Sequence, residues 1–182
     1  MIIGIVGSIA SGKDTVADYL KTKGFESFSH SDALREIMRK EGIETTTQNM
    51  TEFGNNLRRT KGYGYLSELI VNQLNPDKNT IVTSIRQVGE IEYYRTHCSD
   101  FVLIKLDAPI NLRFERLIKR NRPGDIQSMD ELKEIEAKQA DGNKGAINMN
   151  KCYEMADIVV ENDGTFEELY KKVDQIVEEQ ND

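Results

Sequence analysis

The sequence is poor in the residues that build metal centres and disulfide frameworks. It contains two cysteines, Cys98 and Cys152, and two histidines, His30 and His97, and each pair is widely separated. Such isolated residues match neither the ligand spacing of a zinc site nor a redox-active cysteine pair. We therefore expect two partly buried thiols in a reducing compartment, and no metal centre built from these side chains.

Long apolar runs and an excess of positive charge are also missing. No apolar stretch approaches the roughly 20 residues that a membrane helix needs. The apolar start, Met1 to Val6, is short and carries no basic leader, so we expect a strand there and not a signal peptide. The chain has 24 basic and 31 acidic residues, a formal net charge of −7, which argues against broad binding to nucleic acid or anionic lipid. We expect a cytoplasmic protein that binds neither a membrane nor a nucleic-acid polymer.

What the sequence does contain is an alternation of short apolar runs and longer helical stretches, without a repeat or a linker. Continuous apolar runs are typical of parallel strands buried on both faces. The expected strands are Ile2–Val6, Phe25–Ser29, Thr80–Thr83, Phe101–Leu106 and Ile158–Glu161. The expected helices are Lys13–Lys23, Asp32–Glu41, Thr47–Lys61, Tyr65–Leu74, Val88–Thr96, Pro109–Lys119, Ser128–Lys138 and Thr165–Glu179. Residues 1–182 are thus expected to form one α/β domain, a doubly wound parallel sheet of five strands.

Two long excursions interrupt this alternation. Residues from about 31 to 74 place three helices between the second and third expected strands. Residues from about 121 to 155 form a polar, glycine-containing stretch before the last strand. In an open parallel sheet, excursions at the carboxyl edge cover the ligand crevice. We expect the first to bind an acceptor, and call it the acceptor insertion; we expect the second to close over the site, and call it the lid segment.

The strongest motif follows the first expected strand and opens the first expected helix. Its glycines permit a tight turn in which successive main-chain N–H groups point at a phosphate, and the helix adds its positive N-terminal end. Lys13 supplies a mobile cation suited to β- and γ-phosphates. The residues expected to bind a nucleotide here are Gly7, Ser8, Ile9, Ala10, Ser11, Gly12, Lys13, Asp14 and Thr15.

The residue after the lysine departs from the usual pattern. A serine or threonine hydroxyl normally binds Mg²⁺ at that position, whereas this sequence has Asp14 followed by Thr15. Either the carboxylate of Asp14 assists the metal, directly or through water, or Thr15 supplies the hydroxyl. The sequence leaves both possibilities open.

Several arginines follow the fourth expected strand. On a helix Arg113, Arg116 and Arg120 fall at i, i+3 and i+7 and share one face, where like charges destabilise an isolated helix. A bound anion would reverse that penalty, and the alternative is a solvated stripe partly balanced by Glu115. Because phosphoryl transfer relies on neutralising charge, we expect Arg116 and Arg120 to contact polyphosphate, and Arg122 to help bind a substrate.

With these segments, the chain resembles the nucleoside-monophosphate-kinase branch of P-loop proteins. It more closely resembles small kinases carrying Gly-Lys-Asp-Thr, such as phage-type deoxynucleoside monophosphate kinases, and is similar to archaeal adenylate-kinase-related proteins and dephospho-CoA kinases. The resemblance implies a P-loop NTPase-type fold, ATP and Mg²⁺ as cofactors, and the helix of Arg113 to Arg120 as the arm of a lid. It also implies transfer of the γ-phosphoryl group to a (deoxy)nucleoside monophosphate.

Three segments carry the resemblance on the acceptor side: residues 31–35 (Ser-Asp-Ala-Leu-Arg), 56–62 (Asn-Leu-Arg-Arg-Thr-Lys-Gly) and 85–90 (Ile-Arg-Gln-Val-Gly-Glu). The resemblance implies acceptor contacts from Arg35, Arg58 and Arg86, and arginine suits phosphate because its planar fork binds two oxygens. Arg86 is also expected to act in catalysis, and Asp32 to bind a ribose hydroxyl or act as a base. Ser84 stands where relatives often carry an aspartate, which removes the usual second contact to Mg²⁺.

A fourth segment, residues 156–165, resembles the Ala-Asp-x-hydrophobic-hydrophobic-x-Asn-x-Gly signature near the family's C-terminus. The resemblance places Asn162 near the base of ATP. Considered alone, Asn-Asp-Gly predicts a strand-to-helix turn with Thr165 as the helix cap. Two alternatives to a nucleoside monophosphate kinase remain: a dephospho-CoA kinase-like enzyme, and a P-loop regulator or ATPase without a small acceptor.

Overall fold

A computed structural model of the protein describes residues 1–122, 125–140 and 147–180. Its centre is a sheet in which five strands lie in the order β2-β3-β1-β4-β5, and every neighbouring pair is parallel. The strands are β1 (Ile2–Gly7), β2 (Glu26–Ser29), β3 (Thr80–Thr83), β4 (Phe101–Asp107) and β5 (Ile158–Glu161). The predicted doubly wound α/β fold is confirmed.

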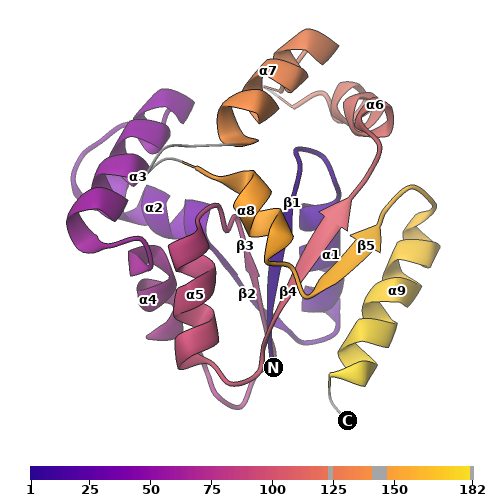
Figure 1. The fold of residues 1–182 in the computed structure, drawn as a ribbon, viewed down its shortest axis with the longest axis horizontal. Helices are drawn as coiled ribbons and strands as arrows, with labels where there is room; N and C mark the ends of the chain where they lie inside the picture. The colour runs from indigo at the N-terminus through magenta and orange to yellow at the C-terminus, as the bar shows by residue number, and fades with distance from the viewer. Residues whose placement is uncertain (123–124, 141–146, 181–182) are drawn as a thin grey trace.

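Helices cover both faces of this sheet (Figure 1). The described residues form α1 (Lys13–Thr22), α2 (His30–Lys40), α3 (Thr47–Lys61), α4 (Tyr65–Val71), α5 (Val88–His97), α6 (Ile110–Arg120), α7 (Met129–Ala140), α8 (Met149–Glu154) and α9 (Phe166–Glu179). Helices α1 and α9 pack on one face, and α5 and α8 pack on the other.

The central strand explains why the first apolar run is continuous. All six residues of β1 are buried because both faces of the strand are covered. Ile3 and Ile5 pack towards α1 and α9, while Ile2 and Val6 pack towards α5 and α8. This alternation follows from the two-residue period of a strand. Because both faces of the strand are buried, neither carries polar residues, and the sequence shows a continuous apolar run instead of an alternating one.

The acceptor insertion and the lid segment each add a small core of their own. Helices α2, α3 and α4 bury Leu34, Met38, Leu57 and Leu66 against one another. Helices α6 and α7 bury Leu117 and Leu132 beside the start of the phosphate loop. Figure 1 shows α6 and α7 near the end of the sheet at which β1 and β4 finish, and α2, α3 and α4 together on the side away from β5 and α9.

The predicted elements agree with the structure to within a few residues at each end. Helix α8 is the exception, because its single short turn lies in the segment that we read only as polar and glycine-containing. The capping box of Thr165 and Glu168 is present at α9. Ser128 accepts from the N–H of Glu131 (3.1 Å). Among the helices of the described residues, none has the length and apolar character needed to cross a bilayer.

Candidate active site

The phosphate loop is wound tightly between β1 and α1. Gly12 has a φ of 106°, a conformation that side chains rarely adopt, and a Cβ there would lie 2.3 Å from Nδ2 of Asn162. A Cβ on Gly7 would lie 2.5 Å from the main-chain oxygen of Leu106. Ala10 is left-handed as well, with a φ of 59°. The two glycines are therefore required by close approach of the surrounding chain, and not only by loop flexibility.

Lys13 is folded back over this loop. Its Nζ donates hydrogen bonds to the main-chain oxygens of Gly7 (2.8 Å) and Ser8 (2.7 Å). Burial lowers the pKa of Lys13 to about 8; the charge of Asp14 opposes this shift, and that of Arg86 adds to it. An anion in the loop would stabilise the charged form of this amine.

Asn162 joins the end of β5 to the loop. Its Nδ2 donates to the main-chain oxygen of Ser11 (2.8 Å), and its main-chain N–H donates to the main-chain oxygen of Asp107 (2.7 Å). Arg116 reaches the same residue from α6, and its Nη2 donates to the main-chain oxygen of Asn162 (2.9 Å). The other terminal nitrogen of Arg116, Nη1, and the hydroxyl of Ser11 are buried without a hydrogen-bond partner among the described residues. Buried polar atoms are seldom left unpaired, so both atoms mark positions that a polar ligand would satisfy.

Beside the loop lies a cavity of about 660 Å³, which we call the loop cavity. It is lined by Ala10, Gly12, Lys13, Asp14, Thr15, Leu112, Arg116, Lys119, Arg120, Arg122, Asn162, Gly164, Thr165, Phe166 and Glu167. The ring of Phe166 is unusually open for its size, at 64 % exposed. The loop residues from Gly12 to Thr15, Arg116 and Arg120 of α6, and Asn162 therefore surround one space, as the sequence led us to expect of a nucleotide site, whereas Arg113 of α6 does not line it.

Two arginines in this cavity have acidic neighbours. Arg120 forms a two-pronged ion pair with Asp125, through Nε (2.9 Å) and Nη2 (2.6 Å). Arg122 lies with Nη1 3.7 Å from the carboxylate of Asp14. We expected Arg122 to help bind a substrate, and the structure places it beside the phosphate loop. The charged side chain that pairs with Asp14 is thus the cation of Arg122 and not a second carboxylate.

Asp14 and Thr15 both line the loop cavity, in the first turn of α1. Within the described residues, no cluster of three or more His, Cys, Asp or Glu side chains could hold a metal by itself. Mg²⁺ does not require one, since it keeps several waters and is usually held by one or two protein oxygens together with substrate phosphates. An exposed carboxylate and a neighbouring hydroxyl beside the loop lysine fit that mode of binding.

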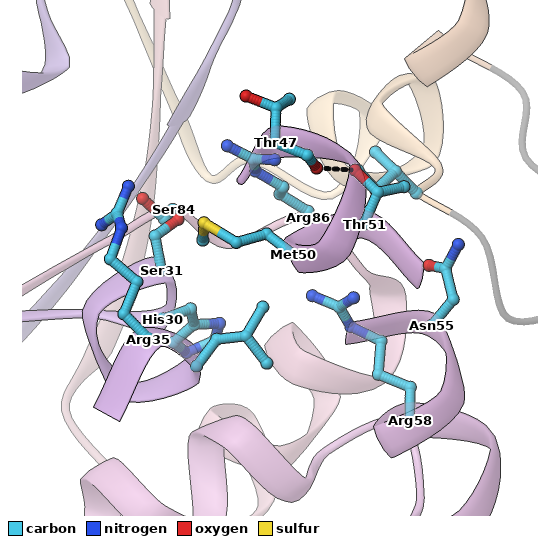
Figure 2. A pocket seen from close by; sticks show the side chains of 12 residues that line it. His30, Ser31, Arg35, Thr47, Met50, Thr51, Asn55, Arg58, Ser84 and Arg86 are labelled. Atoms are coloured by element: carbon cyan, nitrogen blue, oxygen red, sulfur yellow. Dashed lines mark hydrogen bonds between the residues drawn. The ribbon is translucent and has the colours of Figure 1, made fainter. Parts of the chain in front are cut away.

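A second cavity, of about 180 Å³, lies between the acceptor insertion and the end of β3, and we call it the arginine cavity. Its lining residues are His30, Ser31, Leu34, Arg35, Thr47, Met50, Thr51, Asn55, Arg58, Ser84, Arg86 and Ile147 (Figure 2). Arg35 comes from α2, Arg58 from α3 and Arg86 from the segment between β3 and α5. The structure therefore brings together three arginines that lie far apart in the sequence.

The arginines differ in how their charge is balanced. Arg35 pairs with Asp32 (2.7 Å), and Arg58 pairs with Glu90 (Nε to Oε1, 3.0 Å). The guanidinium of Arg86 forms no hydrogen bond or ion pair with the side chains described in the structure. Burial, and next the nearby charge of Arg58, lower the pKa of Arg86. Arg86 is thus the cavity arginine whose guanidinium has no direct ion-pair partner among the described side chains, although the nearby charge of Glu90 opposes the lowering of its pKa.

Two other residues of the acceptor side need comment. Asp32, our candidate for a base or a ribose contact, is 72 % exposed and lies outside the lining of the arginine cavity, bound to Arg35. Ser84 does line the cavity, and its φ of 63° is strained for a residue other than glycine. Its hydroxyl lies 3.3 Å from that of Ser29. Position 84 therefore contributes a neutral hydroxyl, and no carboxylate, to the lining of the cavity.

Sequence reasoning missed a carboxylate that reaches the phosphate loop from α7. Glu136 accepts a hydrogen bond from the N–H of Ile9 (3.1 Å) and forms a two-pronged ion pair with Arg113 of α6. Arg113 also donates to the main-chain oxygen of Ile9 (3.0 Å). No sequence signal indicates this contact, because Glu136 looks like any other acidic residue on an exposed helix.

A second missed residue is Glu90, which is fully buried beneath the arginine cavity. A weak signal was available, since an acidic residue three positions after Gln87 suits a helix cap, and the capping box is present. That signal indicates a cap. It does not indicate the pairing with Arg58.

Comparison with known proteins agrees with this geometry. A family model described as an AAA domain matches residues 3–141, which include the phosphate loop. The UPF0200/UPF0201 protein of Archaeoglobus fulgidus is 32% identical over 181 residues, which cover 97% of this chain and 54% of that protein. The UPF0200 protein of Methanothrix thermoacetophila is 29% identical over 178 residues, which cover 98% of this chain and 97% of that protein. This chain thus spans about half the length of the first relative and nearly all of the second.

Among solved structures, the shikimate kinase of Bacteroides thetaiotaomicron superposes with a TM-score of 0.66 at 16% identity, covering 98% of each chain. At that identity the likeness shows the fold alone. The matched family model covers well over half of the chain, including β1, the phosphate loop and α1. The protein therefore belongs to this AAA domain family of P-loop proteins.

Proposed function

We propose that the protein is an ATP-dependent kinase that transfers the γ-phosphoryl group to the phosphate of a (deoxy)nucleoside monophosphate. One observation carries the proposal: the loop cavity and the arginine cavity are separate, and Lys13 lines the first while Arg86 lines the second. The charge of Arg86 contributes to the lowered pKa of Lys13, so the two cations are close enough to interact. A donor and an acceptor phosphate held at these two positions would meet between them.

On the donor side, the proposal gives the triphosphate of ATP to residues 7–15. Lys13, Arg116 and Arg120 would neutralise charge on the transferring group. The Nη1 atom of Arg116, which is buried without a hydrogen-bond partner among the described residues, supports that role. Asn162 would hold the loop in shape near the base of the nucleotide. Asp14 or Thr15 would hold Mg²⁺, which supplies further positive charge at the phosphates when bound.

On the acceptor side, the lining of the arginine cavity favours an acceptor that is already ionised. Of its lining residues in the described part of the chain, none is an aspartate or a glutamate. A hydroxyl acceptor such as dephospho-CoA needs a base to remove its proton, whereas a phosphate oxygen does not. Asp32 could be that base only by leaving its ion pair with Arg35. Arg35, Arg58 and Arg86 instead suit the phosphate of a nucleoside monophosphate.

In the transfer step, an oxygen of the acceptor phosphate forms a bond to the γ-phosphorus as the bond from that phosphorus to the β-phosphate oxygen breaks. We further propose that residues 1–182 act as one domain, with the acceptor insertion at about 31–74 and the lid at about 121–155. The lid would close over the site, excluding water so that ATP is not hydrolysed without an acceptor. Parts of this lid, residues 123–124 and 141–146, lie outside the described residues.

The proposal is tested by measuring ATP consumption in the presence of ribo- and deoxynucleoside monophosphates, dephospho-CoA and phosphomevalonate, with identification of the product. We expect a nucleoside monophosphate to accelerate turnover, and Lys13→Ala to abolish transfer while the protein stays folded. Lys21→Ala, an exposed lysine at the far end of α1, is the matched control and should retain activity. If no acceptor accelerates turnover but ATP binds, a P-loop regulator or ATPase becomes the better description. Transfer by a folded Lys13→Ala protein would remove the mechanism.

A further inference from the structure

Among the acidic side chains of the described residues, Glu90 alone is fully buried, at 0 % exposure. A buried carboxylate is costly unless charges and hydrogen bonds compensate it. Here the compensation is extensive. Oε1 accepts from Nε of Arg58 (3.0 Å), and Oε2 accepts from the N–H groups of Arg86 (2.8 Å) and Gln87 (3.2 Å). Oε2 also lies 3.1 Å from Nδ1 of His30.

These partners come from different parts of the acceptor side. Arg58 belongs to α3, His30 begins α2, and Arg86 lies in the turn from β3 into α5, which carries Glu90 itself. Arg58, His30 and Arg86 all line the arginine cavity, while Glu90 lies beneath them and does not. One carboxylate thus ties together three walls of the cavity without facing its interior.

The charge state of Glu90 suits this tie and excludes a chemical role. Burial by itself would raise the pKa of Glu90, but attraction to His30 and Arg58 outweighs burial and lowers the pKa to about 2. The carboxylate is therefore ionised and fully occupied, so it does not take up a proton from a substrate. Its negative charge also offsets the repulsion between Arg58 and Arg86, which would otherwise push the two side chains apart.

Resting on the proposed function, we propose that Glu90 is the positioning residue for the acceptor phosphate. It holds the Arg58 guanidinium and the Arg86 main chain in the arrangement that binds a phosphate dianion before the acceptor arrives. Preorganised cations bind an anion more tightly than mobile ones, since less conformational freedom is lost on binding. If the Glu90–Arg58 ion pair only stabilised the fold, apolar side chains of similar size could replace both partners without loss of stability.

The test separates this role from a purely structural one. Glu90→Gln keeps the shape of the side chain but removes its charge, and Glu92→Gln, an exposed neighbour on α5, is the matched control. We expect Glu90→Gln to raise the acceptor KM about tenfold to hundredfold while leaving the KM for ATP unchanged, because a small misplacement of a binding group is enough to produce such a loss. Glu92→Gln should match the wild type. An unchanged acceptor KM, or an equal loss for both substrates, would overturn the proposal.

A double variant then asks whether Glu90 acts through Arg58. If it does, Arg58→Gln combined with Glu90→Gln should have nearly the same acceptor KM as Arg58→Gln alone, since the position of an absent guanidinium no longer matters. Two fully additive losses would contradict this route. If Glu90→Gln does not fold, Glu90→Asp decides: it keeps the negative charge and all three cavity arginines but draws the carboxylate back from Nε of Arg58, so it should also weaken acceptor binding. Wild-type binding by Glu90→Asp would overturn the role.

Calorimetry with inorganic phosphate keeps the inference distinguishable from the kinase proposal. We expect phosphate to bind the wild type and to bind Glu90→Gln about tenfold more weakly or worse, even if no nucleoside monophosphate proves to be a substrate. That result would retain the positioning role while the proposed acceptor failed. Absence of phosphate binding to the wild type, or equal binding by both proteins, would overturn the positioning role whatever the kinase assay shows.

Discussion

Arg113 of α6 and Glu136 of α7 form a two-pronged ion pair directly beside the phosphate loop, with Nη2 of the arginine 3.1 Å from Oε2 of the glutamate. The same carboxylate accepts the N–H of Ile9, one of the loop amides. An anionic group from the protein therefore occupies a donor that would otherwise be open to a phosphate. These contacts join the lid segment to the phosphate loop.

Glu136→Gln should increase the affinity for ATP. The substitution removes a negative charge that competes with the triphosphate and frees Arg113 to approach it. We expect binding about two- to tenfold tighter, the range that corresponds to one competing hydrogen bond of ordinary strength. Calorimetry with a non-hydrolysable ATP analogue measures it. Glu134→Gln, an exposed residue of the same helix paired with Lys138, should leave affinity unchanged. Weaker binding by Glu136→Gln would mean that the carboxylate helps the nucleotide.

Binding of ATP should be coupled to proton uptake by Lys13. Burial lowers the pKa of Lys13 to about 8 in the free protein, and a bound triphosphate would raise it. The affinity for ATP should therefore fall as the pH rises through 8. At a pH about one unit above that value, binding should take up nearly one proton. Calorimetry in two buffers of different ionisation enthalpy measures this uptake, which Lys13→Met should eliminate. Equal proton uptake by both proteins would assign it to another group.

The unpaired charge of Arg86 should matter for the acceptor more than for ATP. Arg86→Gln removes the one cavity arginine whose guanidinium forms no direct ion pair with a described side chain, so we expect a rise of about tenfold or more in the acceptor KM. A fall in kcat should accompany it if Arg86 also stabilises the transferring group. Steady-state kinetics with each substrate varied in turn gives both constants. Arg59→Gln, exposed on α3, is the control and should behave like the wild type. A change confined to the KM for ATP would contradict the acceptor role.

Gly12→Ala should disrupt the phosphate loop in a way that positive φ alone does not explain. Gly12 and Gly24 have φ values of 106° and 91°, so alanine costs roughly 1–2 kcal/mol of backbone strain at either position. Only at Gly12 would the new Cβ collide with a neighbour, at 2.3 Å from Asn162, while Gly24 has nothing within 4 Å. We expect loss of ATP binding in Gly12→Ala and retention in Gly24→Ala. Thermal unfolding of both proteins separates loop damage from general instability, and similar ATP affinities would refute the collision.

The fold was predictable because its signals are local. The apolar run of β1, the glycines and lysine of the phosphate loop, and the start of α1 lie in one continuous stretch, so their spacing carries the whole arrangement. Thr165 similarly predicted the start of α9, because helix capping is local: the capping box that it forms with Glu168 involves residues only three apart. Helix α8 was not predicted, since one short turn has too little periodicity to stand out from its polar surroundings.

The acceptor side was predictable in its residue types and not in its contacts. The resemblance to small kinases named Arg35, Arg58 and Arg86, and the structure brings these three together around one cavity. It also named Asp32, which lies outside that cavity. Arg122, expected from the arginine run after the fourth strand to help bind a substrate, lies beside Asp14. Neighbouring positions on a helix point in different directions, so a matching motif does not decide which side chain reaches a cavity.

The order of the elements, the phosphate loop and its lysine follow from the sequence alone, because hydrophobic periodicity and loop glycines act over a few adjacent residues. Only the tertiary structure decided that Glu90 lies beneath Arg58 and that Glu136 reaches the loop. Each of these contacts joins helices whose relative placement depends on how their apolar faces pack. The packing of the helices decides which charged side chains come into contact, so the sequence around Glu90 or Glu136 does not indicate the role of either residue.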